Sequence, residues 1–86
     1  MSGTVELYDA PVFERGDRVR ATKSVRNDGT FPGAAMGEVL IDEGDMGYVH
    51  SVGTYLNRYY IYGVEFVARR RVVGMRANEL LREDDE

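Results

Sequence analysis

The chain has 86 residues, no cysteine and a formal net charge of -4 at pH 7, with 43% hydrophobic and 30% charged residues. These values are typical of one small folded domain, and they exclude a disulfide framework and a cysteine-ligated zinc site. The acidic balance disfavours nucleic acid, no apolar run approaches the roughly 20 residues of a membrane-spanning helix, and the N-terminus lacks a leader pattern, so we expect a cytoplasmic protein without a membrane contact.

The first half of the chain predicts a lead-in, one short strand and a long loop. Residues 1–11 show no clear period and end in Ala-Pro, which is typical of a loosely held terminus. A half-buried strand is predicted over 18–22, where apolar and charged side chains alternate. Residues 23–44 are irregular and rich in glycine, and within them residues 38–41 fit either a short strand or a buried turn.

The second half predicts three longer strands and a short helical turn. Alternation favours strands over 45–52, 59–68 and 71–76, with a loop before the second and a tight Arg-Arg turn after it. Residues 77–81 fit a single helical turn that covers the open end of the sheet. The segment 82–86 is an acidic tail.

This pattern predicts an all-β fold, a small SH3-like antiparallel barrel with a long early loop and a short C-terminal helical turn. We expect Tyr62, Val64 and Phe66 to face inward, because Gly63 and Glu65 alternate with them. Curling the sheet buries one face and reduces the exposed edges. The expected organisation is a flexible lead-in at 1–11, one barrel domain at 12–81 and the tail at 82–86.

Two polar and aromatic segments are the candidate partner-binding site. Asn-Asp-Gly and Pro-Gly are turn signals that flank Phe31, which therefore either packs on the core from outside or meets a partner. The chain has six tyrosines and no tryptophan, and tyrosine is enriched at protein interfaces. If Phe31, Tyr55 and Leu56 meet on one rim, they form an apolar patch; the alternative is that these side chains fold back and plug the barrel. The candidate contact residues are Arg26, Asn27, Asp28, Gly29, Thr30, Phe31, Pro32, Gly53, Thr54, Tyr55 and Leu56.

The sequence contains few groups that could carry chemistry. The single histidine, His50, lies on a predicted strand without a ligand or nucleophile partner, which favours an outward-facing or hydrogen-bonded side chain. The acidic cluster at residues 42–45 is formally an acid-base candidate, but such turns are usually solvated. The arginines at 69–71, near several tyrosines, fit either RNA binding or a solvated turn that keeps an edge strand from aggregating. The sequence therefore predicts neither a catalytic site nor a metal site.

Several motifs together resemble the NifZ family of nitrogen-fixation accessory proteins. The resemblance covers residues 16–81, and its most specific pieces are Asn-Asp-Gly-Thr-Phe-Pro-Gly at 27–33 and Val-Gly-Thr-Tyr-Leu at 52–56. The other matching pieces are Gly-Asp-Arg-Val-Arg at 16–20, Gly44 with Gly-Tyr-Val at 47–49, Ile-Tyr-Gly-Val-Glu-Phe at 61–66, Val-Gly-Met-Arg at 73–76, and Glu-Leu at 79–80.

The resemblance implies a chaperone-like adaptor that assists maturation of the nitrogenase molybdenum-iron protein, in the assembly of its P-cluster from paired iron-sulfur precursors. The expected partner is that protein or its assembly intermediates, and no cofactor or catalysis of its own is implied. Met75 stands where the family is expected often to carry cysteine. Thiolates are the usual cluster ligands, so the cluster should stay on the partner.

Two other functions remain open from the sequence. One is a small SH3-like subunit of a multichain redox enzyme, similar to the variable chain of ferredoxin:thioredoxin reductase, which shares the Gly-Asp-x-Val-Arg opening. The other is an RNA-binding module centred on the arginines at 69–71.

Overall fold

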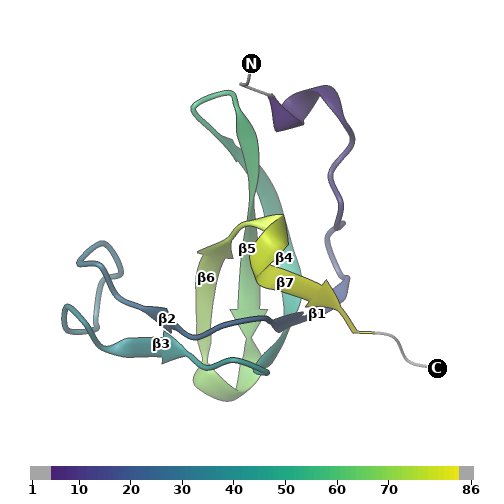
Figure 1. Ribbon diagram of the computed structural model, residues 1–86. Helices are drawn as coiled ribbons and strands as arrows, with labels where there is room; N and C mark the ends of the chain where they lie inside the picture. The colour runs from purple at the N-terminus through teal and green to yellow at the C-terminus, as the bar shows by residue number, and fades with distance from the viewer. Residues whose placement is uncertain (1–4, 84–86) are drawn as a thin grey trace.

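The computed structural model describes residues 5–83, and its elements are strands joined by turns and single 3-10 turns (Figure 1). In chain order they are η1 (Glu6–Tyr8), β1 (Arg18–Ala21), β2 (Val25–Arg26), β3 (Val39–Ile41), β4 (Met46–Tyr55), β5 (Tyr59–Phe66), η2 (Val67–Arg69), β6 (Arg71–Met75), η3 (Ala77–Glu79) and β7 (Leu80–Arg82). The described chain is thus mostly β, and it contains no long helix.

The strands form two antiparallel sheets. The larger has the order β6-β5-β4-β1-β7, and the smaller pairs β2 with β3. Every pairing in both sheets is antiparallel. In Figure 1 the long β4–β5 hairpin rises to the top, while the β2–β3 ribbon extends to the left.

The expected closed barrel is not found within residues 5–83, because β6 and β7 remain the two edges of the larger sheet. Other segments cover the core instead of a closing strand pair. Phe13 is buried and packs edge-on against Tyr62, with ring centroids 5.4 Å apart. From the smaller sheet, Leu40 and Ile41 enter the same apolar cluster.

The inward face of β5 is as the alternation predicts. Tyr62, Val64 and Phe66 are at most 1% exposed, and burial of apolar surface is the main favourable contribution to folding in a chain without disulfides. The Tyr62 hydroxyl accepts a hydrogen bond from the Val12 N–H at 2.9 Å, so the buried phenol has a partner. The described part of the core consists of Phe13, Val19, Ala21, Leu40, Ile41, Val49, Tyr62, Val64, Phe66, Val73, Met75 and Leu80.

Gly47 lets β4 pass close to β5. A Cβ at this position would lie 2.5 Å from the Glu65 carbonyl oxygen and 2.8 Å from Val64 Cγ1. Any side chain larger than hydrogen would therefore push against backbone that cannot move without disturbing the ladder.

Several boundaries differ from the sequence-based expectations. β4 continues to Tyr55 rather than ending near residue 52, and β5 ends at Phe66 because η2 follows it. The expected helical turn at 77–81 is a 3-10 turn followed by β7, which pairs with β1. Of the expected acidic tail, residue 82 belongs to β7, the Glu83 N–H donates to the Arg18 carbonyl, and residues 84–86 lie outside the described part.

The expected lead-in is attached to the hairpin from residue 6 onward. The Glu6 N–H donates to the Arg58 carbonyl at 2.8 Å, and the Tyr60 hydroxyl donates to the Asp9 carbonyl at 2.7 Å. Residues 1–4, the first part of that expected lead-in, lie outside the described residues.

Candidate functional site

Asn27 organises the loop between β2 and β3. Its side chain is buried at 3% exposure, and Nδ2 donates to the carbonyls of Ala34 (2.9 Å), Phe31 (3.1 Å) and Ala35 (3.2 Å). Its Oδ1 accepts the N–H groups of Gly29 and Phe31, both at 3.0 Å. The sequence placed Asn27 among the contact residues, but its buried side chain instead holds the loop together from inside.

The neighbouring polar residues remain at the surface. Asp28 Oδ1 accepts the Thr30 hydroxyl at 2.6 Å and the Thr30 N–H at 3.1 Å. The hydroxyl is the larger of these two influences, and together they hold the pKa of Asp28 below its ordinary value. Gly29 has φ +102, and a Cβ there would also lie 3.0 Å from Met36 Cε. This exposed part of the loop, with Arg26 and Pro32, therefore has a defined shape.

Phe31 is half-buried and packs against the core cluster. The Arg71 guanidinium carbon lies 5.4 Å from its ring centroid, and the same guanidinium donates to the Leu40 carbonyl at 3.3 Å. A surface pocket of about 280 Å³ opens beside the ring, lined by Val25, Arg26, Asn27, Asp28, Thr30, Phe31, Leu40, Val73 and Gly74. Of the two roles considered for Phe31, packing on the core from outside matches this placement, and the pocket leaves part of its surroundings accessible.

The turn between β4 and β5 presents the other candidate segment. Tyr55 is 51% exposed and Leu56 is 69% exposed. Leu56 and Asn57 have φ values of 56 and 54, and the Arg58 N–H donates to the Tyr55 carbonyl at 3.0 Å, as in a type I′ turn. Gly53 and Thr54 precede them as exposed residues of β4. Two apolar side chains thus stand at the end of the longest hairpin.

The two segments do not meet on one rim. The β2–β3 loop lies at the left of Figure 1, whereas the β4–β5 turn lies at its top. The patch that would join Phe31, Tyr55 and Leu56 is therefore not formed within this chain. Tyr8, 88% exposed on η1, lies at the same end of the molecule as the turn, because the Glu6 N–H is hydrogen-bonded to the Arg58 carbonyl. No sequence pattern around Tyr8 indicated this position.

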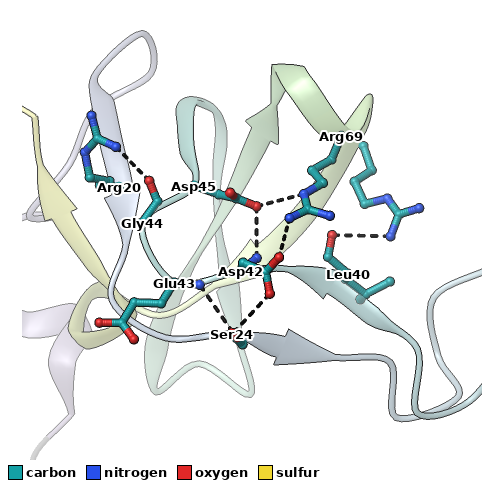
Figure 2. Close-up of polar contacts among 9 residues, drawn as sticks. Arg20, Ser24, Leu40, Asp42, Glu43, Gly44, Asp45 and Arg69 are labelled. Carbon is teal, nitrogen blue, oxygen red and sulfur yellow. Dashed lines mark hydrogen bonds and ion pairs between the residues drawn. The ribbon is translucent and has the colours of Figure 1, made fainter.

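The acidic turn after β3 is bound by Arg69, which lies on η2 after β5. Figure 2 shows Arg69 donating through Nε to Asp45 Oδ2 at 2.8 Å and through its terminal nitrogen to Asp42 Oδ2 at 2.5 Å. The Ser24 hydroxyl is 3.4 Å from the other Asp42 oxygen, and the Glu43 N–H donates to that hydroxyl at 3.3 Å. The cluster therefore links the turn after β3 to η2.

The electrostatics of this cluster follow from the pairing. Partial burial opposes ionisation of Asp45, but the Asp42 N–H and the Arg69 guanidinium outweigh it, so the pKa of Asp45 lies below its ordinary value. The hydrogen bonds that Arg69 donates to Asp45 and then to Asp42 raise the pKa of Arg69. Asp45 and Arg69 therefore stay charged across the physiological range, which fits a structural contact rather than proton transfer.

The remaining chemical candidates are placed as follows. His50 is exposed on β4, at the point where the pairing register with β5 shifts, which confirms an outward-facing side chain. Within residues 5–83, no three histidine or carboxylate side chains converge as metal ligands do. No helix in the described part is long and apolar enough to cross a membrane. Of the arginines at 69–71, Arg69 is ion-paired and Arg71 stacks on Phe31, so the basic turn is largely occupied by contacts within the chain.

Comparison with known proteins places the chain in a family. The NifZ domain family matches residues 10–82. The chain is 51% identical over 76 residues to the putative NifZ protein of Sinorhizobium fredii, covering 88% of this chain and 70% of that protein. It is 45% identical over 71 residues to the probable NifZ protein of Rhodobacter capsulatus, covering 83% of this chain and 91% of that protein.

A longer relative shows the same similarity over part of its length. The chain is 48% identical over 71 residues to the NifZ protein of Azotobacter vinelandii, which covers 83% of this chain and 45% of that protein. No solved structure matches the chain. The family match and these identities, over most of the sequence, show that the chain belongs to the NifZ family of nitrogen-fixation accessory proteins.

Proposed function

We propose that this protein assists maturation of the nitrogenase molybdenum-iron protein in the cytoplasm, at the assembly of its P-cluster, as a chaperone-like adaptor without catalysis of its own. One observation supports this most strongly. A chain of the NifZ family presents Tyr55 and Leu56 to solvent on a hydrogen-bonded turn. Exposed apolar side chains on a defined turn are suited to contact with another protein.

Binding alone can perform this task. A ligand that prefers one conformation of its client shifts the client's population toward that conformation, and no covalent step is needed. The proposed contact comprises the exposed residues of both segments: Arg26, Asp28, Gly29, Thr30, Pro32, Gly53, Thr54, Tyr55 and Leu56. Because the segments are separated, they would touch two different parts of the client, or the client and a further assembly factor.

The cluster itself is proposed to stay on the client. The full chain has no cysteine, and thiolates are the usual protein ligands of iron-sulfur clusters. Met75, at the position where cysteine is expected in the family, is 1% exposed in the core. A side chain at this position faces inward in this fold, so even a cysteine here would be poorly placed to reach a surface-bound cluster.

The test is a maturation experiment in a nitrogen-fixing strain that lacks this chain. We expect molybdenum-iron protein purified from that strain to contain less iron and to reduce less acetylene than protein from a strain supplied with the wild-type chain. A Val49→Asp variant should fail to restore either property, because it places a carboxylate at a core position that is 2% exposed.

Two results would contradict the proposal. Fully loaded, active molybdenum-iron protein in the absence of the chain would show that maturation does not need it. Recovery of the wild-type chain in a lasting stoichiometric complex with a mature enzyme would instead indicate a permanent subunit.

A further inference from the structure

We infer that the β4–β5 turn is the anchor of the contact, with Leu56 and Tyr55 entering an apolar hollow on the client and Arg58 meeting a carboxylate on the rim of that hollow. The identity of the client rests on the proposed function. The choice of this turn over the β2–β3 loop rests on the backbone, exposure and charge of the turn itself.

The backbone at Leu56 is unfavourable for leucine. Its φ of 56 lies in the left-handed region, where an L-residue with a Cβ is strained and where type I′ turns favour asparagine, aspartate or glycine. Asn57, with φ 54, fits the turn, but Leu56 does not. Among residues 5–83, little packing offsets this strain, because the leucine side chain is 69% exposed. A large apolar side chain held at a strained, exposed position points to a use outside the chain.

The surroundings of the turn are already ordered for binding. The Tyr55 and Tyr59 rings lie 5.5 Å apart, and the Arg76 guanidinium carbon lies 3.6 Å from the Tyr59 ring centroid. The hydrogen bond that the Glu6 N–H donates to the Arg58 carbonyl holds the other side of the turn. Because little conformational freedom is left to lose, association at this turn carries a small entropic penalty. The Phe31 side chain, by contrast, is partly committed to the core.

Charge selects the chemistry of the occupant. The chain carries a net charge of -4, yet the residue that borders Leu56 and Asn57 is a cation, and Arg58 forms no ion pair among residues 5–83. A cation that has no ion-pair partner in this part of the chain, beside two apolar side chains, complements a hollow with an acidic rim on a protein. An anionic lipid surface is disfavoured, because the acidic chain as a whole is repelled by it.

The test measures affinity and stability in the same variants. Immature molybdenum-iron protein, purified from a strain that lacks this chain, is immobilised and titrated with the full chain. Leu56→Asn should weaken binding at least tenfold while raising the midpoint of thermal unfolding, because asparagine relieves the strain and removes the anchor. Leu81→Asn is the matched control: Leu81 is also an exposed leucine, at 62%, but it lies on β7, where its backbone is extended. It should leave the dissociation constant within twofold of wild type.

A charge variant tests the rim. Arg58→Gln should slow association and flatten the dependence of the association rate on salt, because the steering charge is lost. If the salt dependence of association is identical to that of the wild-type chain, the inference that Arg58 meets an acidic rim on the client is wrong.

The remaining outcomes separate the anchor from the proposed function. If the wild-type chain and Leu56→Asn bind equally well, Leu56 is not the anchor of the contact, and the proposed function stands. If the wild-type chain does not bind the immature protein, both the proposed function and the role of Leu56 are contradicted. Leu56-dependent sedimentation with phosphatidylglycerol vesicles, or a dimer of the wild-type chain that Leu56→Asn dissociates, would also overturn the anchor, since the occupant would then be a lipid surface or a second copy.

Discussion

Replacing Asn27 with alanine should destabilise the protein far more than its place in a surface loop suggests. The side chain donates to three carbonyls and accepts from two N–H groups at 3% exposure. A buried hydrogen bond contributes about 1 kcal/mol net, and orphaned partners add a desolvation penalty. Because Nδ2 shares two hydrogens among three acceptors and water can reach part of the loop, we expect a loss of about 3 kcal/mol.

That loss is a large fraction of the free energy of unfolding of a domain of this size, since domains are stabilised by roughly 0.05–0.15 kcal/mol per residue. The midpoint of thermal unfolding should fall by about 15 °C, measured by circular dichroism, with a matching fall in the urea midpoint. Asn78→Ala is the control, because Asn78 is exposed on η3 and its loss should change stability by less than about 0.5 kcal/mol. An Asn27→Ala variant within about 1 kcal/mol of wild type would refute the role given to this side chain.

Three further predictions follow from the contacts described above. Gly47→Ala should lower stability by about 2 kcal/mol in urea unfolding, because its Cβ overlaps backbone, whereas Gly53→Ala, with nothing within 4 Å, should be close to neutral. Folding lowers the pKa of Asp45 from its ordinary value of 3.8. Its contribution to the free energy of unfolding is therefore fully present above pH 3.8 and is lost as the pH falls through the lower pKa of the folded state. Arg69→Gln should make this loss of stability in acid less steep. RNA should not be retained by the chain in filter binding at low salt, because the arginines at 69–71 are largely engaged within the chain.

Each of these has a contradicting result. Equal stability of the Gly47 and Gly53 variants would show that the hairpin has room for a Cβ. If Arg69→Gln unfolds in acid as steeply as wild type, Arg69 does not lower the pKa of Asp45. Salt-dependent retention of RNA would show that the exposed Arg70, with its neighbours, suffices for binding.

The alternation of apolar and polar residues predicted the strand positions and inward faces that depend on neighbouring residues in the sequence. The inward face of β5 was predictable because Tyr62, Val64 and Phe66 alternate with residues that do not pack in a core. The strand at 18–21 was predictable for the same reason. The sequence left open whether Tyr55 and Leu56 face outward or plug the core, and the structure exposes both, at the end of a hairpin whose strands extend further into the loop than the pattern indicated.

Contacts between distant residues were not predictable in this way. The acidic turn and the arginine turn each looked solvated, and only the fold brings Arg69 to Asp42 and Asp45, which are 27 and 24 residues away. β7 has three residues and is a strand because β1 lies beside it. Asn27 looked like part of an exposed Asn-Asp-Gly turn, and its burial depends on the eight residues after it wrapping around its amide.

The separation of the two candidate segments also required the fold. Both carry turn signals and aromatic residues, so the sequence alone allowed a single rim with Phe31 beside Tyr55. The β4–β5 hairpin has ten residues in its first strand and eight in its second, and this length carries its turn away from the β2–β3 loop (Figure 1). Strand length, more than composition, decides where the apolar side chains are presented.

Hydrogen exchange of the chain alone and in complex with immature molybdenum-iron protein tests most directly whether this protein works by contact through its turns. We predict slower exchange of the amides at 53–58 in the complex, with a smaller effect at 28–33. Unchanged exchange at 53–58, or protection confined to the β1–β7 side of the sheet, would contradict the account.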